Sequence, residues 1–162
     1  MDRASFSCER DGDVLVLGGA IDERTQLQPL LHSAGSKHLV LDLAGVTFIN
    51  SLGVREWVRL QTVARDSGVR FELHRVAEVL ILQLNIVPAA RAASDVKSFF
   101  ATYVCDRCGE EQTELIDVAA HRPALEKLQA PPVACRACKQ PAALSEPPEL
   151  YFSFLAGTSP LR

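Results

Sequence analysis

The chain has 162 residues, of which 48% are hydrophobic and 23% are charged, and its net charge is −3 at pH 7. This balance is typical of a globular protein that buries a core, and it argues against a largely disordered chain. Residues 1–98 carry 11 basic and 12 acidic side chains, and residues 99–162 carry 6 and 8. Neither part has the basic excess of proteins that bind nucleic-acid phosphates, so a nucleic-acid partner is disfavoured.

Membrane attachment and secretion are also disfavoured. The longest apolar runs, such as Val79–Leu82, are interrupted within a few residues by charged or amide side chains. They fall far short of the ~18 residues that a membrane-spanning helix needs. The chain begins MDRASFSCERDGD, with acidic residues where a secretory signal has a basic start and an apolar stretch. We therefore expect a cytoplasmic protein that does not bind membranes.

The first third of the chain predicts a β-hairpin followed by a short helix. Apolar residues alternate through 6–21 around the sequence Asp-Gly-Asp at 11–13, which is typical of two antiparallel strands joined by a turn. Leucines at helical spacing predict a helix over 25–33. Cys8 lies within the first strand, where we expect it to be a small buried apolar residue.

A long strand and an amphipathic helix are predicted next. Residues 38–49 are rich in branched apolar side chains, which predicts a strand buried on both faces of a parallel or mixed sheet. Residues 52–67 place apolar side chains, including Trp57, on one face and a polar stripe on the other. This pattern predicts a helix that packs against the sheet and ends at Gly68.

A further strand and helix complete the first domain. Residues 69–73 alternate as a strand does, and residues 77–87 have the pattern of an amphipathic helix that Pro88 ends. Because strands and helices alternate along the chain, the predicted fold class is α/β, a mixed sheet packed with helices. We assign this domain to residues 1–98, with the small and polar residues 89–97 as a linker.

The most informative stretch of this domain is residues 39–54, which read LVLDLAGVTFINSLGV. It resembles the STAS family, the sulfate-transporter and anti-sigma-factor-antagonist domains, in which a strand ending in DLSGVTFIDSSGL runs directly into a helix. Residues 18–22, GGAID, resemble the L-x-G-x-I/L-D signature of the same family. The resemblance covers residues 6–98 and implies a STAS-like mixed sheet packed with helices.

The resemblance also implies a regulatory role for one serine. In family members that are anti-sigma-factor antagonists, the serine of this motif is phosphorylated by a partner kinase, which is itself the anti-sigma factor. Alignment of the motif places that serine at Ser51, so the implied partner is a kinase, an anti-sigma factor or a larger signalling assembly. The sequence departs from the motif at Asn50, where the family has aspartate, and Arg55 makes the neighbouring surface more basic.

A simpler role for the same residues follows from helix chemistry. Asn50 or Ser51 is a suitable N-cap for the helix that begins near Leu52, a role worth about 1 kcal/mol. A phosphate on Ser51 would also be tolerated there, because the first turn presents unpaired N–H groups and the positive end of the helix dipole. Capping and phosphorylation are compatible, and both remain open. The candidate partner surface consists of Asn50, Ser51, Leu52, Arg55 and Arg59.

No motif of the sequence indicates catalysis. The nucleophile elbow G-x-S-x-G requires glycines that do not flank Ser51. The histidines at 32, 38, 74 and 121 have no acidic partner at a characteristic spacing, and we expect structural roles for them. The sequence therefore predicts a protein that is not an enzyme.

Two C-x-x-C pairs in the last third of the chain predict a metal site. They are Cys105 with Cys108 and Cys135 with Cys138, separated by 26 residues. In a reducing compartment such pairs bind a metal more often than they form disulfides or a redox dithiol. Four thiolates with no vacant position suit one structural Zn²⁺, which would contribute directly to the folding of a small module.

We assign this module, residues 99–162, as a β-rich zinc ribbon. Strands are predicted over 99–104, 112–118 and 150–155, with a short helix over 117–128. A rubredoxin-like iron centre is the alternative, although Lys139 replaces the glycine that follows the second pair in rubredoxins.

Together these features favour a non-catalytic regulatory or adaptor protein. Its STAS-like domain would bind a signalling partner, with Ser51 phosphorylation as a control, and the zinc ribbon would supply a second contact. The alternatives are a nucleic-acid-binding or transcription-associated zinc-ribbon protein and a rubredoxin-like electron carrier.

Overall fold

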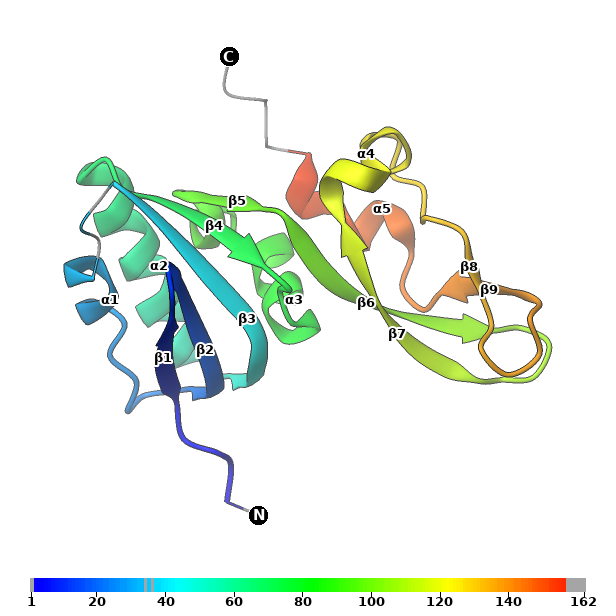
Figure 1. Cartoon of the computed structure of the whole chain (residues 1–162), viewed down its shortest axis with the longest axis horizontal. Helices are drawn as coiled ribbons and strands as arrows, with labels where there is room; N and C mark the ends of the chain where they lie inside the picture. The colour runs from blue at the N-terminus through cyan, green and yellow to red at the C-terminus, as the bar shows by residue number, and fades with distance from the viewer. Residues whose placement is uncertain (1, 34, 36, 157–162) are drawn as a thin grey trace.

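The computed structural model describes residues 2–33, 35 and 37–156 (Figure 1). Within these residues the strands form two sheets, one of five strands and one of four. Buried side chains from both sheets belong to one continuous hydrophobic cluster. The fold is mixed α/β with a small β-rich module that holds four cysteines, which confirms the predicted fold class.

The five-stranded sheet has the order β1-β2-β3-β4-β5. Its strands are β1 (Ser7–Asp11), β2 (Val14–Ile21), β3 (His38–Ile49), β4 (Arg70–His74) and β5 (Ser94–Val96). The hairpin β1–β2 is antiparallel, as predicted, and the remaining neighbours are parallel. Cys8 lies on the edge strand β1, whose residues are all exposed. The prediction that Cys8 is buried is therefore wrong, because the core does not extend beneath this edge strand.

Strand β3 is buried on one face only, so the prediction of burial on both faces is also wrong. Leu39, Leu41 and Leu43 point into the core, whereas Val40 and Asp42 between them are half-exposed. The same alternation continues in β4. The sheet thus packs its apolar face against the helices and presents a largely polar face on the other side.

The helices of this part are α1 (Pro29–His32), α2 (Ser51–Asp66), α3 (Glu78–Ile86) and the 3-10 helix η1 (Pro88–Arg91). The long helix α2 packs Trp57, Leu60 and Ala64 into the core. Helix α1 is shorter than predicted because Pro29 has no N–H and fits only the first turn of a helix. None of the helices among the described residues has the length and apolar character that a membrane span requires.

The segment predicted as a linker, 89–97, is instead part of the fold. It forms most of η1 and the edge strand β5, and the side chains of Ala90 and Ala93 are fully buried. Trp57 Nε1 donates to the Ala90 carbonyl at 2.7 Å, and the Gln61 side chain accepts from the Ala93 N–H at 3.0 Å. The small residues that suggested a linker let the backbone approach helix α2 closely.

The second sheet is antiparallel, with the order β7-β6-β9-β8. Its strands are β6 (Ser98–Cys105), β7 (Glu111–Asp117), β8 (Val133–Ala134) and β9 (Pro141–Leu144). Helix α4 (Val118–Glu126) follows β7, as predicted, and Asp117 caps it by accepting from the Ala120 N–H. The strand predicted over 150–155 is wrong, because α5 (Pro148–Tyr151) and the 3-10 helix η2 (Ser153–Leu155) occupy this segment.

The C-terminal helical turns join the second sheet to the first part of the chain. Phe99 of β6 packs edge-to-face against Phe152 and Phe154, with ring centroids 5.8 and 5.1 Å away. The Asn85 side chain of α3 donates to the Tyr151 carbonyl and accepts from the Phe154 N–H. Figure 1 shows α5 beside the second sheet, and both α5 and η2 contact α3. The base of the cysteine-bearing module is thus packed against α3.

Candidate metal centre and partner surface

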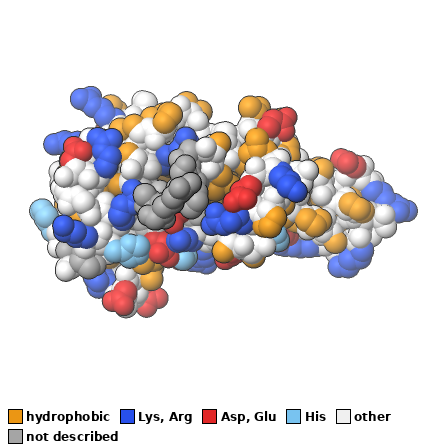
Figure 2. All heavy atoms as spheres, turned by 90° about the horizontal axis from the view of Figure 1, so that it is seen from above, with side chains coloured by type: hydrophobic (Ala, Val, Ile, Leu, Met, Phe, Trp, Pro, Cys, Tyr) orange, Lys and Arg blue, Asp and Glu red, His pale blue; other side chains and the backbone are white. Residues whose placement is uncertain are grey.

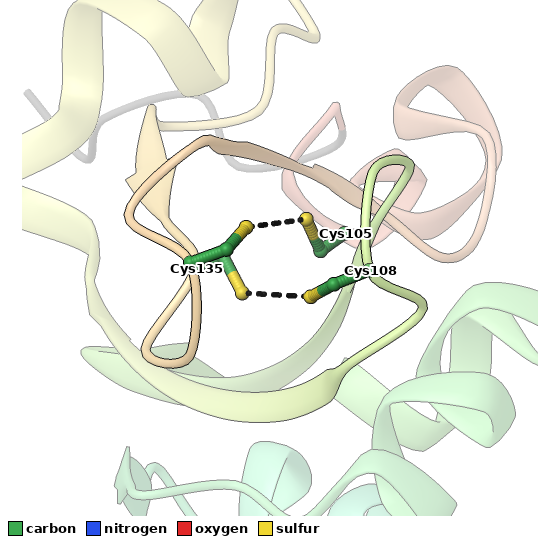
Figure 3. Close-up of side chains that lie close together, drawn as sticks. Cys105, Cys108 and Cys135 are labelled. Atoms are coloured by element: carbon green, nitrogen blue, oxygen red, sulfur yellow. Dashed lines mark hydrogen bonds between the residues drawn. The ribbon is translucent and has the colours of Figure 1, made fainter.

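Four sulfur atoms meet at the far end of the second sheet. Cys105 Sγ lies 3.5 Å from Cys138 Sγ, and Cys108 Sγ lies 3.5 Å from Cys135 Sγ. All four sulfurs lie within 4.8 Å of one another. Figure 3 shows the side chains of Cys105 and Cys108 on one loop facing Cys135 on the other. The structure therefore brings together all four cysteines that the sequence predicts as metal ligands.

Each C-x-x-C pair occupies a tight turn of the same design. In the first turn the Gly109 N–H donates to the Cys105 carbonyl at 2.8 Å, and in the second the Lys139 N–H donates to the Cys135 carbonyl at 2.9 Å. Gly109 and Lys139 both have a left-handed backbone, with φ of 77° and 64°. Lys139 adopts the conformation that favours glycine at this position. Lys139, which replaces the glycine of the rubredoxin pattern, therefore leaves the geometry of the turn unchanged.

Backbone N–H groups prepare two of the thiols for metal binding. The pKa of Cys105 is lowered to about 7, chiefly because the Cys108 N–H donates to its sulfur and also because the Arg107 N–H does so. The pKa of Cys135 is lowered in the same way, chiefly by the Cys138 N–H. Since the thiolate is the form that binds metals, these contacts favour the ligand state of both side chains.

The Gln112 side chain of β7 holds the backbone of the second turn, a role that was not predicted from the sequence. This buried side chain accepts from the Arg136 N–H at 2.8 Å and donates to the Ala134 carbonyl at 3.2 Å. The Arg136 guanidinium in turn pairs with Glu114 at 2.8 Å. The sequence does contain a signal for this role: a glutamine at an inward-facing position of a strand, shortly after a C-x-x-C pair.

The arrangement fits one tetrahedral metal ion. Metal–sulfur bonds of ~2.3 Å place the sulfurs of a tetrahedron about 3.8 Å apart. The observed separations, from 3.5 Å to within 4.8 Å, bracket that value. They are far longer than the ~2.05 Å of a disulfide. Four cysteines are therefore arranged to bind one metal ion, with no position left open for a substrate.

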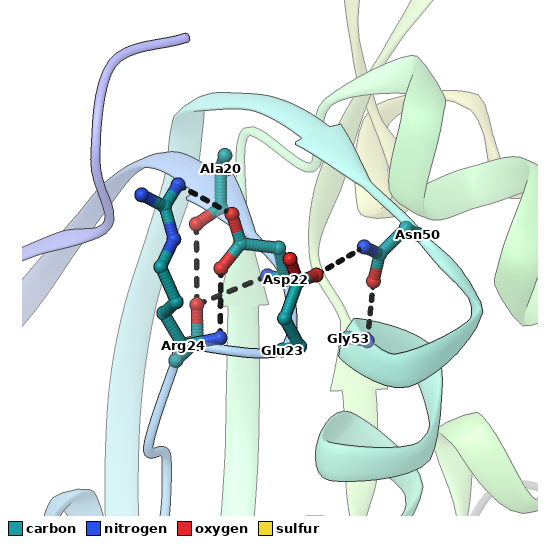
Figure 4. Close-up of polar contacts among 7 residues, drawn as sticks. Ala20, Asp22, Glu23, Arg24, Asn50 and Gly53 are labelled. Atoms are coloured by element: carbon teal, nitrogen blue, oxygen red, sulfur yellow. Dashed lines mark hydrogen bonds and ion pairs between the residues drawn. The ribbon is translucent and has the colours of Figure 1, made fainter.

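The second candidate site is the corner at which β3 runs directly into α2. Asn50 is the N-cap of α2: its Oδ1 accepts from the Gly53 N–H at 2.8 Å, and its Nδ2 donates to Glu23 at 2.8 Å (Figure 4). The Asn50 N–H also donates to the Ile21 carbonyl at 3.3 Å. The capping role of Asn50 is therefore confirmed, and the corner is fixed against the end of β2.

Gly53 is required for this close approach. A Cβ at this position would lie 2.0 Å from the carbonyl oxygen of Ile21, a distance that real side chains do not tolerate. The first turn of α2 therefore presses directly on the backbone of β2. The residues on its outer side are held on a rigid support.

Those outer residues form the predicted partner surface. Ser51, Leu52, Arg55 and Arg59 are exposed. Leu52, Arg55 and Arg59 line a surface hollow of about 370 Å³ beside the helix start. Within the described part of the chain, the Ser51 hydroxyl makes no hydrogen bond. The structure thus gathers the predicted surface residues at one corner.

The acidic side chains around the hollow form hydrogen bonds or ion pairs with other residues of the chain. Asp22 accepts from the Arg24 guanidinium at 2.8 Å, which is the main reason why its pKa is lowered. Glu56 accepts from the Leu27 N–H at 3.0 Å. The pKa of Glu23 is lowered by its own backbone N–H and then by the Asn50 side chain. These carboxylates hold the loop after β2 in place.

Two of the four histidines share an acidic partner on the polar face of the five-stranded sheet. Glu72 of β4 lies 2.6 Å from His74 Nε2 and 3.2 Å from His38 Nε2 of the neighbouring strand. The hydrogen bond with His74 is the chief reason why the pKa of Glu72 is lowered. The two-residue spacing of Glu72 and His74 on a strand was a signal that sequence reasoning missed.

Charged side chains of both signs lie on the face of the molecule that Figure 2 shows. Figure 2 shows acidic and basic side chains interspersed along one face rather than gathered in a single basic patch. Around the four cysteines, the exposed Arg107 and Lys139 are accompanied by Asp106 and Glu110. Comparison with models of known protein families, with curated proteins and with solved structures found no match to this chain.

Proposed function

We propose that this chain is a non-catalytic regulatory or adaptor protein that binds a signalling partner through the corner between β3 and α2. The observation that carries the proposal is the exposed group of Ser51, Leu52, Arg55 and Arg59 on a rigidly supported helix start. The resemblance of residues 6–98 to STAS domains supports it, because in that family this corner carries the regulated serine. The partner class is a kinase or an anti-sigma factor.

Phosphorylation of Ser51 is the proposed control of this contact. The hydroxyl is exposed in the first turn of α2, one turn before Arg55. A phosphate there would add a charge of about −1.5 to −2 next to that arginine and change how the corner docks on a partner. Asn50 in place of the family's aspartate keeps the cap without adding a carboxylate beside the serine.

The metal centre has a structural role in this proposal, with zinc as the ion. Four thiolates form a closed site for Zn²⁺, which supplies cross-linking between the two turns rather than an open coordination position. Gln112 orients the second turn from outside the ligand set, because it bonds to the backbone on either side of Cys135. The ordered module then offers a second contact surface beside α3.

Affinity capture from an extract of the native host tests the proposed contact. Leu52→Arg should lose the protein captured by the wild-type chain, and Ser51→Glu should weaken it. Leu115→Arg is the matched control, because Leu115 is 49% exposed and Leu52 is 50% exposed. Loss of the same captured protein with both arginine variants, or with neither, would count against the corner as the binding site. Intact-mass measurement of the chain from native cells tests Ser51 for phosphate.

A further inference from the structure

One face of helix α2 carries a continuous exposed stripe that runs away from the corner. It consists of Leu52, Arg55, Arg59 and Val63. At 100° per residue, these four positions lie within about 80° of one another around the helix axis. Leu52 is 50% exposed and Val63 is 38% exposed. The stripe therefore has an apolar residue at each end and two arginines between them.

The two arginines of the stripe have no partner within the described part of the chain. Neither Arg55 nor Arg59 makes a hydrogen bond or an ion pair with residues 2–33, 35 or 37–156. The nearby Arg24, by contrast, pairs with Asp22 at 2.8 Å. The carboxylates that line the hollow have partners of their own, and Glu56 accepts from the Leu27 N–H. The groups left unpaired at the hollow are thus two guanidinium groups and an exposed leucine.

The spacing of these groups matches a helix. Arg55 and Arg59 are one helical turn apart, and Leu52 and Val63 are eleven residues, or about 16 Å, apart along α2. A partner helix packed along α2 can present two carboxylates one turn apart to the arginines. It can place apolar side chains on the two ends at the same time.

We propose that the stripe Leu52–Arg55–Arg59–Val63 docks an acidic amphipathic helix of the signalling partner. This inference rests on the proposed function, since it specifies the chemistry of the partner at the same corner. The unpaired guanidinium groups of Arg55 and Arg59 select carboxylates on the partner, and the apolar ends select a folded helix rather than a polyanion. The charged residues around the hollow, three acidic and three basic, cancel: Asp22, Glu23, Glu56, Arg24, Arg55 and Arg59. Because these charges cancel, the hollow has no net positive potential, and a nucleic-acid backbone would gain little binding free energy there.

A peptide-binding experiment with the full chain tests the inference. The probe is a fluorescent, alanine-based helical peptide with two glutamates one turn apart, placed between two leucines eleven positions apart. The matched peptide has lysines in place of the glutamates. Fluorescence anisotropy should show that the wild-type chain binds the glutamate peptide at least about tenfold more tightly, as expected for two opposite-charge pairs at a partly desolvated surface.

Charge reversal on the protein provides the decisive comparison. The double variant Arg55→Glu with Arg59→Glu should prefer the lysine peptide over the glutamate peptide. The variant Arg122→Glu with Lys127→Glu, which changes the net charge equally at exposed sites near α4, should behave as the wild type does. Leu52→Ser should weaken binding of the glutamate peptide severalfold. Equal binding of both peptides, or charge reversal without effect, would overturn the inference.

Two further outcomes separate this inference from the proposed function. If Leu52→Arg abolishes capture of the native partner while the glutamate peptide fails to bind, the corner is a docking site but not for an acidic helix. If a DNA duplex displaces the peptide and Leu52→Ser has no effect, the arginines attract polyanions in general, which also overturns the inference. Failure of Leu52→Arg to affect capture counts against the proposed function itself.

Discussion

The substitution Gly53→Ala tests how the corner is built. Alanine normally stabilises the interior of a helix by about 1 kcal/mol relative to glycine. Here the added Cβ would lie 2.0 Å from the Ile21 carbonyl oxygen, and contacts below 3.0 Å are essentially never seen for real Cβ atoms. The start of α2 must therefore move by at least about 1 Å, since both sides of the contact are backbone.

The free-energy cost of that movement follows from the contacts at the corner. It strains the hydrogen bond from the Asn50 N–H to Ile21, which is already 3.3 Å long, and the cap between Asn50 and the Gly53 N–H at 2.8 Å. Overpacking costs about 1–3 kcal/mol and a lost cap costs about 1 kcal/mol, whereas the gain in helix propensity offsets about 1 kcal/mol. We expect a net loss of about 1–3 kcal/mol, or roughly 2–12 °C in Tm.

Thermal and urea unfolding of the full chain measures this loss. Gly35→Ala is the matched control, because a Cβ at Gly35 meets no atom within 4 Å, and it should leave Tm nearly unchanged. If Gly53→Ala raised Tm or left it unchanged, the close contact between α2 and β2 would be wrong. The partner surface would then also lack the rigid support that this contact provides.

Three further predictions concern other parts of the molecule. Gln112→Ala should weaken metal binding about 10–100-fold in a chelator competition, because the backbone on both sides of Cys135 loses its hydrogen-bond partner. Phe152→Ala should destabilise the whole chain by about 3–5 kcal/mol in urea unfolding, since this ring is fully buried, whereas Leu150→Ala, at an exposed position, should not. The hydrogen bond with His74 lowers the pKa of Glu72 in the folded chain. The ionised Glu72 therefore stabilises the folded state above the usual carboxyl pKa, and this stabilisation is lost as the pH falls through the lowered pKa. Glu72→Gln should therefore reduce stability at neutral pH and flatten the acid limb of the stability curve.

Elements with a strong local pattern were predictable from the sequence. The helix predicted over 52–67 is observed as Ser51–Asp66, because its apolar face, its cap and Gly68 all lie within one segment. The four cysteines were predictable for a similar reason, since each C-x-x-C pair forms its own turn. A long-range contact is needed only to bring the two pairs to one point. The presence of two equally spaced pairs in one small segment indicated that contact.

Features that depend on distant contacts were not predictable in the same way. The small residues of 89–97 suggest a linker until helix α2 is placed against them, and the Gln61 side chain then bonds to the Ala93 N–H. The aromatic segment 150–155 has the composition of a strand, yet it forms helical turns packed on Phe99 and α3. The exposure of Cys8 depends on where the core ends beneath the sheet. In each case tertiary packing decides between local alternatives.

The four-cysteine metal site is tested most directly by the metal content of the purified full chain, determined together with native mass spectrometry. We expect one zinc ion per chain, lost in Cys135→Ser and retained in the matched variant Cys8→Ser, because Cys8 lies outside the four-cysteine cluster. One iron ion per chain and a red colour would instead indicate a rubredoxin-like centre. A metal-free chain with disulfides between these cysteines, or zinc that remains bound in Cys135→Ser, would show that the four cysteines do not form a zinc site.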